Sequence, residues 1–167
     1  MYDLGLKDKV ILITGGSDGL GYASAELLSS EGAHVVICGR RGDYLYEKAK
    51  IITEKTGNEV LPIKADVSNS DDCKKLVEGT IAKYKKIDVL VNNAGASAAA
   101  LFEDVTDKNW EDDINLKLMS TIRMCRLAIP YMKSNNGGVI INATINGAPR
   151  VDPLKFFCYK LKKKKGN

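Results

Sequence analysis

The stretch VILITGGSDGLG, residues 10–21, decides the fold. Its short apolar run ends at Thr14, and Gly15, Gly19 and Gly21 follow in the pattern T-G-x-x-x-G-x-G. Because a helical, alanine-containing stretch comes next, the pattern predicts a buried strand that turns through glycines into a helix. The free backbone N–H groups and the positive end of the helix dipole would form an anion site there. The alternative is a glycine-rich turn that binds no ligand.

Each glycine of this loop has its own expected task. Gly15 permits the tight turn, Gly19 lets the backbone approach a pyrophosphate, and Gly21 lets the helix pack closely on the strand. The residues predicted to bind a ligand in this loop are Thr14, Gly15, Ser17, Gly19, Leu20 and Gly21.

Composition indicates one soluble domain. The 167 residues are 44% hydrophobic, and no apolar run approaches the roughly 20 residues of a membrane span. Charged residues interrupt the first ten positions, which is not typical of a signal peptide. The cysteines have no metal-binding spacing and only one histidine, His34, accompanies them, so no metal site is predicted. Reduced thiols in a cytoplasmic protein are expected for Cys38, Cys73, Cys125 and Cys158.

The formal net charge of +4 comes from the end of the chain. Residues 151–167 hold six lysines and one aspartate, a charge of +5, which leaves −1 for the first 150 residues. Because the basic character is confined to a tail, no nucleic-acid-binding face and no membrane contact are predicted for the domain.

Apolar runs and amphipathic segments alternate along the chain. The runs predict strands at residues 9–14, 33–38, 59–65, 88–91 and 138–143, and the segments predict helices at 20–30, 44–55, 70–84 and 106–134. Near-continuous β-branched runs are typical of buried parallel strands. The expected fold is therefore α/β, a Rossmann-like, doubly wound parallel sheet of order 3-2-1-4-5. We assign residues 1–149 to this domain and residues 150–167 to an atypical basic tail.

Several motifs together resemble the short-chain dehydrogenase/reductase family. TGGSDGLG is similar to its cofactor loop, Asp66-Val67 to the pair that contacts the adenine ring, and Asn92-Asn93-Ala94-Gly95 to the motif after its fourth strand. Residues 110–116, WEDDINL, resemble the helix segment that supplies a catalytic asparagine, here Asn115. The resemblance covers residues 6–149 and implies cofactor contacts by Asp66, Val67, Asn92, Ala94 and Gly95.

Two of these residues can also be interpreted without the family resemblance. At the end of a strand, Asp66 can accept a hydrogen bond from an exocyclic amine, or it can open a turn and cap the next helix. Asn115 lies in mid-helix, where asparagine is unfavourable, which suggests a functional or bend-inducing role.

The charges after the second strand indicate the choice of cofactor. An acidic residue there would bind a ribose diol, but the chain has Gly39 followed by Arg40 and Arg41. Arginine forms bidentate, charge-assisted contacts with phosphate. We therefore expect NADP(H), with NAD(H) and two solvated arginines as the alternative.

The family resemblance implies that a small-molecule carbonyl is reduced or an alcohol oxidised. The implied residues are Asn115, Thr144 as the hydroxyl that orients the substrate, and Tyr159 with Lys163 as the proton-transferring pair. A phenol with a pKa near 10 needs a neighbouring cation to act at neutral pH. Tyr159 and Lys163 lie in a lysine-rich stretch, however, so a lysine four residues after a tyrosine is expected there by chance and is weak support for this pair.

The tail RVDPLKFFCYKLKKKKGN, residues 150–167, leaves the function open between two hypotheses. The tail is interpreted as a truncated or frameshifted end, or as a basic segment that adheres to anionic lipid or nucleic acid, and we favour the first interpretation. The first functional hypothesis is an NADP(H)-dependent oxidoreductase, which is inactive if the tail is a remnant of truncation or a frameshift. The alternative is a non-catalytic nucleotide-binding fragment or regulatory module. The family resemblance also implies a homo-oligomer.

Overall fold

The protein, seen here as a computed structural model, is described over residues 4–96 and 102–143. Five parallel strands form one sheet in the order β3-β2-β1-β4-β5, which confirms the predicted topology. The strands are β1 (Val10–Thr14), β2 (His34–Gly39), β3 (Val60–Lys64), β4 (Val89–Asn92) and β5 (Val139–Asn142). Each lies within one residue of its predicted bounds.

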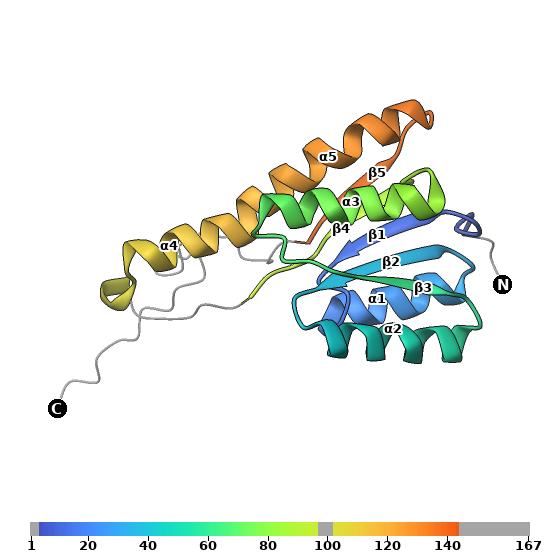
Figure 1. Ribbon diagram of the computed structural model, residues 1–167, viewed down its shortest axis with the longest axis horizontal. Coiled ribbons are helices and arrows are strands. Elements are labelled where there is room, and N and C mark those ends of the chain that lie inside the picture. The colour runs from blue at the N-terminus through green and yellow to red at the C-terminus, as the bar shows by residue number, and fades with distance from the viewer. Residues whose placement is uncertain (1–3, 97–101, 144–167) are drawn as a thin grey trace.

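Helices cover both faces of the sheet (Figure 1). α1 (Gly19–Ser30) and α2 (Gly42–Thr56) lie on one face, and α3 (Ser70–Tyr84) and α5 (Ser120–Ser134) lie on the other. α4 (Asp107–Ile114) extends past the sheet, preceded by the short 3-10 helix η1 (Phe102–Asp104).

The alternation of side chains along β1 and β2 divides the core into two layers. Ile11, Ile13, Val35 and Ile37 pack against α1 and α2, whereas Leu12 and Val36 face α3 and α5. All six are at most 1% exposed. Strands that are buried on both faces account for the near-continuous apolar runs in the sequence.

The predicted helix over residues 106–134 is divided by a π-helical turn, η2 (Asn115–Met119), which the sequence pattern did not predict. The backbone N–H of Ser120 bonds to the carbonyl oxygen of Asn115, five residues back. A single π-helical turn is defined by its backbone hydrogen bonds, and the spacing of apolar residues predicts a helix without distinguishing the two kinds of turn. The turn begins at Asn115, for which the sequence suggested a functional or bend-inducing role.

The last described strand, β5, lies at one end of the sheet. It follows a turn in which Asn136 and Gly137 have φ angles of 60° and 121°, as the Asn-Gly sequence predicts. Among the described residues β5 pairs only with β4, and Val139 and Ile141 are 55% and 49% exposed. In the described part of the chain, the outer edge of β5 therefore has no strand paired with it.

Candidate cofactor-binding site

A cavity of about 780 Å³ lies at the carboxyl ends of four strands. It is bordered by the loops that follow β1, β2, β3 and β4, and by Leu116 of the π-helical turn. The strand order reverses between β1 and β4, and open α/β sheets bind ligands at this kind of position. Ten of the residues predicted to bind cofactor line the cavity: Gly15, Ser17, Gly19, Leu20, Arg40, Arg41, Asp66, Val67, Ala94 and Gly95.

The glycine loop has the geometry of an anion site. Gly15 and Gly19 have φ angles of 68° and 51°, which favour glycine. A Cβ built on Gly15 would lie 2.9 Å from the Cα of Ala94, whereas one on Gly19 would have nothing within 4 Å. Gly19 is also the first residue of α1, so its open side coincides with the positive end of the helix dipole. This space fits the phosphate groups of a dinucleotide.

Two further glycines allow close packing around this loop. A Cβ on Gly21 would lie 2.2 Å from the carbonyl oxygen of Gly15, so only glycine lets α1 pack so close to the loop. Gly16 is equally constrained, because its Cβ would lie 2.5 Å from Cγ2 of Ile37. The loop pattern does not indicate Gly16, because its constraint comes from Ile37 on a neighbouring strand.

Thr14 and Asn93 join the loops that follow β1 and β4. Thr14 Oγ1 accepts hydrogen bonds from the backbone N–H groups of Asn93 and Ala94, at 2.9 and 3.0 Å. The side-chain amide of Asn93 donates to the carbonyl oxygens of Thr14 and Gly15. Thr14 is 2% exposed, so it shapes the cavity from behind rather than lining it. Asn93 does line the cavity.

Asn92 also lies behind the cavity. Its Nδ2 atom donates to Asn142 Oδ1 at 2.9 Å and to Cys125 Sγ at 3.5 Å, which ties β4 to β5 and α5. Its Oδ1 atom is buried and has no hydrogen-bond partner among the described residues. These contacts place Asn92 in the support of the sheet rather than in the cavity wall.

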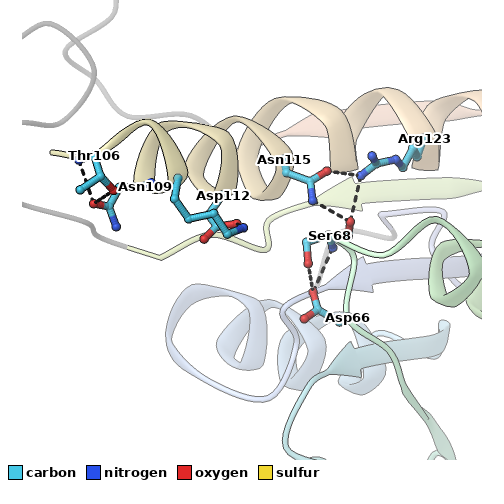
Figure 2. A network of polar contacts seen from close by, with 8 residues as sticks. Asp66, Ser68, Thr106, Asn109, Asp112, Asn115 and Arg123 are labelled. Carbon is cyan, nitrogen blue, oxygen red and sulfur yellow. Dashed lines mark hydrogen bonds and ion pairs between the residues drawn. The ribbon is translucent and has the colours of Figure 1, made fainter.

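A hydrogen-bond network connects the loop after β3 to the π-helical turn (Figure 2). Asp66 Oδ1 accepts from the backbone N–H and the hydroxyl of Ser68, at 3.0 and 2.7 Å. The carbonyl oxygen of Ser68 accepts from Asn115 Nδ2 at 3.0 Å and from Arg123 Nη1 at 3.1 Å. Arg123 Nη1 also donates to Asn115 Oδ1 at 2.6 Å.

The structure corrects part of the prediction that Asp66 opens a turn and caps the next helix. The residue opens a turn, as expected, but it does not cap α3, because the side chain of Asn69 accepts from the first N–H groups of that helix. Asn69 is closer to the helix start, and its oxygen reaches the N–H groups of Asp71 and Asp72.

The predicted catalytic residues are only partly described. Both polar atoms of the Asn115 side chain are bonded in the network, and its neighbour Leu116 lines the cavity instead. Thr144, Tyr159 and Lys163 lie outside the described residues. Lys117 forms an ion pair with Asp113 in the same segment, at 2.6 Å.

Charges gather where the loops after β1 and β2 meet. Arg41 lies over the ring of Tyr44, 4.2 Å from its centroid, and its Nη2 atom is 3.4 Å from Asp18 Oδ2. Asp18 is not predictable from the loop pattern, because nothing in that pattern indicates which side chain it approaches. Leu20 is 79% exposed beside this group, an apolar side chain available to a ligand.

Burial disfavours the thiolate form of the cysteine in the cavity wall. Burial raises the pKa of the Cys38 thiol to about 12, which keeps it protonated.

In the described part of the chain, no three His, Cys, Asp or Glu side chains form a group that could hold a metal ion. None of the helices described here is long and apolar enough to span a membrane.

The sequence profile described as short chain dehydrogenase matches residues 9–157. The chain belongs to this family. The matched region contains the glycine loop, every strand of the sheet and all residues that line the cavity.

Other short-chain dehydrogenases share both sequence and fold with the chain. It is 36% identical over 143 residues to the 3-oxoacyl-[acyl-carrier-protein] reductase FabG of Chlamydia trachomatis, covering 85% of this chain and 58% of that protein. L-sorbose reductase from Gluconobacter frateurii, solved with NADPH and L-sorbose, superposes with a TM-score of 0.86 at 36% identity, covering 92% of this chain and 57% of that one. A 7α-hydroxysteroid dehydrogenase solved with NADH has a TM-score of 0.83 at 28% identity, with coverages of 88% and 57%. The chain thus spans less than three fifths of the length of each of these three relatives.

Proposed function

We propose that the chain binds NADP(H) and forms the cofactor-binding portion of an oxidoreductase for a small-molecule carbonyl or alcohol. The observation that carries this proposal is the cavity of about 780 Å³, which is lined by the open start of α1 and by two arginines. The bound nicotinamide would supply the hydride, and the protein would supply binding, orientation and proton transfer.

Arg40 and Arg41 support NADP(H) over NAD(H). Both follow β2 and line the cavity, and the position before them is Gly39 rather than an acidic residue. A 2′-phosphate would receive charge-assisted, bidentate hydrogen bonds from these side chains, and NAD(H) has no group that could. The relatives include structures with either cofactor, so the choice rests on the chain's own residues.

The remaining cofactor contacts follow the loops. Gly19 would admit the pyrophosphate, Asp66 and Val67 the adenine, and Ala94 and Gly95 a ring close to the main chain. Thr14, Gly21 and Asn92 would act from behind the cavity by holding these loops in place.

For catalysis we propose Asn115, Thr144, Tyr159 and Lys163. Because its side chain is bonded to Ser68 and Arg123, Asn115 would act by positioning the segment that carries Leu116 rather than by touching substrate. Thr144 would orient the substrate oxygen, and Tyr159 would exchange a proton with it while the Lys163 cation lowers the pKa of the phenol.

Nucleotide binding without catalysis is the second candidate function. The described residues that line the cavity lie between Gly15 and Leu116, and this set already includes the glycine loop and both arginines, which supports binding as a function by itself. A homo-oligomer is also proposed, because Ile114, Leu118 and Ile122 are 42%, 56% and 36% exposed at four-residue spacing on adjoining helices.

The free thiols of the described residues, at Cys38, Cys73 and Cys125, support a cytoplasmic location.

Binding and turnover measured on the same sample test this proposal. We expect calorimetry to show NADPH binding, and we expect the chain with residues 154–167 deleted to bind with little change in affinity. For turnover of a carbonyl substrate panel we expect a negligible rate if the tail is a scar. A rate that disappears on Tyr159→Phe would establish the complete enzyme, whereas absence of binding to either dinucleotide would contradict both candidate functions.

A further inference from the structure

Asp18 occupies the point where the two charged parts of the cavity meet. One oxygen, Oδ1, accepts a hydrogen bond from the backbone N–H of Gly19 at 2.9 Å. The other, Oδ2, lies 3.4 Å from Arg41 Nη2, which belongs to the loop after β2. Both residues line the cavity, so this contact joins the glycine loop to the arginines within the site.

Arg41 is held on two sides, whereas Arg40 is not. Its guanidinium group stacks on Tyr44, 4.2 Å from the ring centroid, while Asp18 pairs with its Nη2 atom. Lys48 Nζ also lies over the ring of Tyr44, 5.0 Å from its centroid. Among the described residues no carboxylate lies within ion-pair distance of Arg40. The two arginines therefore differ in how freely they can meet an anion.

We propose that Asp18 sets the strength of the preference for NADP(H) over NAD(H), by pairing with Arg41. This inference rests on the proposed function, because it assigns a role within the same cofactor site. A 2′-phosphate that engages Arg41 must compete with the Asp18 carboxylate for the guanidinium group. NAD(H), which has no 2′-phosphate, does not meet this cost at that position. Asp18 thus limits the preference that Arg40 and Arg41 provide.

The Asp18→Asn variant removes the charge and retains the cap. Asparagine is as good an N-cap as aspartate, so its Oδ1 atom can still accept from Gly19 and the start of α1 is preserved. The matched control is Asp43→Asn, which removes a charge from an exposed residue in the first turn of α2, two positions after Arg41. No ion pair joins Asp43 to Arg41 in the described structure.

The experiment is a calorimetric titration of the full chain, once with NADPH and once with NADH. We expect Asp18→Asn to raise the ratio of NADPH to NADH affinity about three- to fivefold, the upper range for an exposed ion pair. Asp43→Asn should leave this ratio within about twofold of the parent chain, as expected for an unpaired surface charge.

A double-mutant cycle separates pairing from general repulsion. In an Arg41→Ala background, Asp18→Asn should change the affinity ratio by less than about twofold, because the pair no longer exists. An unchanged ratio in Asp18→Asn, or an equal increase with and without Arg41, would contradict the inference while leaving the proposed function intact. Absence of binding to both dinucleotides in the parent chain would contradict the proposed function, and the inference with it.

Discussion

Asn115 donates a hydrogen bond from Nδ2 to the backbone carbonyl oxygen of Ser68, at 3.0 Å and across 47 positions of sequence. The bond fastens the π-helical turn to the loop after β3, where Asp66 and Val67 line the cavity. π-helical turns inside helices often occur at functional sites, and here the turn presents Leu116 to the cavity. The contact makes the position of the π-helical turn between α4 and α5 depend on the loop after β3.

Replacing Asn115 with alanine should loosen this connection. We expect a loss of about 1 kcal/mol in the free energy of unfolding and a several-fold weaker affinity for NADPH, because a part-buried hydrogen bond to the loop is removed. The control is Asn109→Ala, which removes the hydrogen bonds that Asn109 Oδ1 accepts from the backbone N–H and the hydroxyl of Thr106, at the far end of α4 (Figure 2). Denaturant unfolding should show a similar loss for both variants, while calorimetry should show weaker binding only for Asn115→Ala. Equal affinities in both would mean that the network does not shape the site.

Replacing Gly19 with valine should abolish dinucleotide binding and leave the fold intact. The side chain would enter the open space beside the start of α1, where we place the pyrophosphate. Valine at a φ of 51° also costs about 1–2 kcal/mol of stability. Gly57→Val supplies the matched control, because Gly57 has a φ of 74°, has nothing within 4 Å of its Cβ position, and lies outside the cavity lining. Calorimetric titration of Gly19→Val that gives the affinity of the Gly57→Val control would overturn the assignment of this loop.

Replacing Arg40 and Arg41 together with alanine should weaken NADPH far more than NADH. Each charge-assisted hydrogen bond to phosphate is worth about 1.5–3 kcal/mol, and NADH lacks the phosphate. The charge-matched control is Lys50→Ala with Lys74→Ala, two exposed lysines on α2 and α3 that each pair with a glutamate four residues later. Titrations with both dinucleotides should show an altered affinity ratio in the arginine variant only. Equal losses for NADPH and NADH would identify Arg40 and Arg41 as general surface charge.

Asp88 should make the stability of the fold depend on pH. Burial by itself raises the pKa of Asp88, but the hydrogen bond from the Val10 N–H and the Lys86 ammonium group outweigh it, so the pKa is lower than usual. A lowered pKa means that the carboxylate stabilises the fold at neutral pH, and that this contribution is lost as the pH falls through the folded-state pKa.

The measurement is denaturant unfolding of the parent chain and of Asp88→Asn across the acidic range. We expect the variant to be about 2 kcal/mol less stable at pH 7, with the difference shrinking as the pH is lowered. A difference that stays constant down to the pH at which the parent unfolds would show that charge is not what Asp88 contributes.

How far the sequence determines this protein differs between its local and its distant features. The strand order and the glycine loop were predictable, because residues 10–21 specify a strand, a turn and a helix within one local pattern, and buried parallel strands have a characteristic apolar run. The family membership was predictable for the same reason, since its motifs are short and contiguous.

The tertiary structure alone decided which side chains meet in the cavity. Asp18 and Arg41 are 23 positions apart, and Asn115 and Ser68 are 47 apart, so neither pairing belongs to a local pattern. Gly16 is required by its contact with Ile37 on the neighbouring strand, and the π-helical turn at Asn115 is defined by a backbone hydrogen bond from Ser120 that apolar spacing does not specify. A periodic sequence determines which elements form, whereas their packing determines which charges and hydrogen bonds the site contains, because those contacts depend on distances between separate elements.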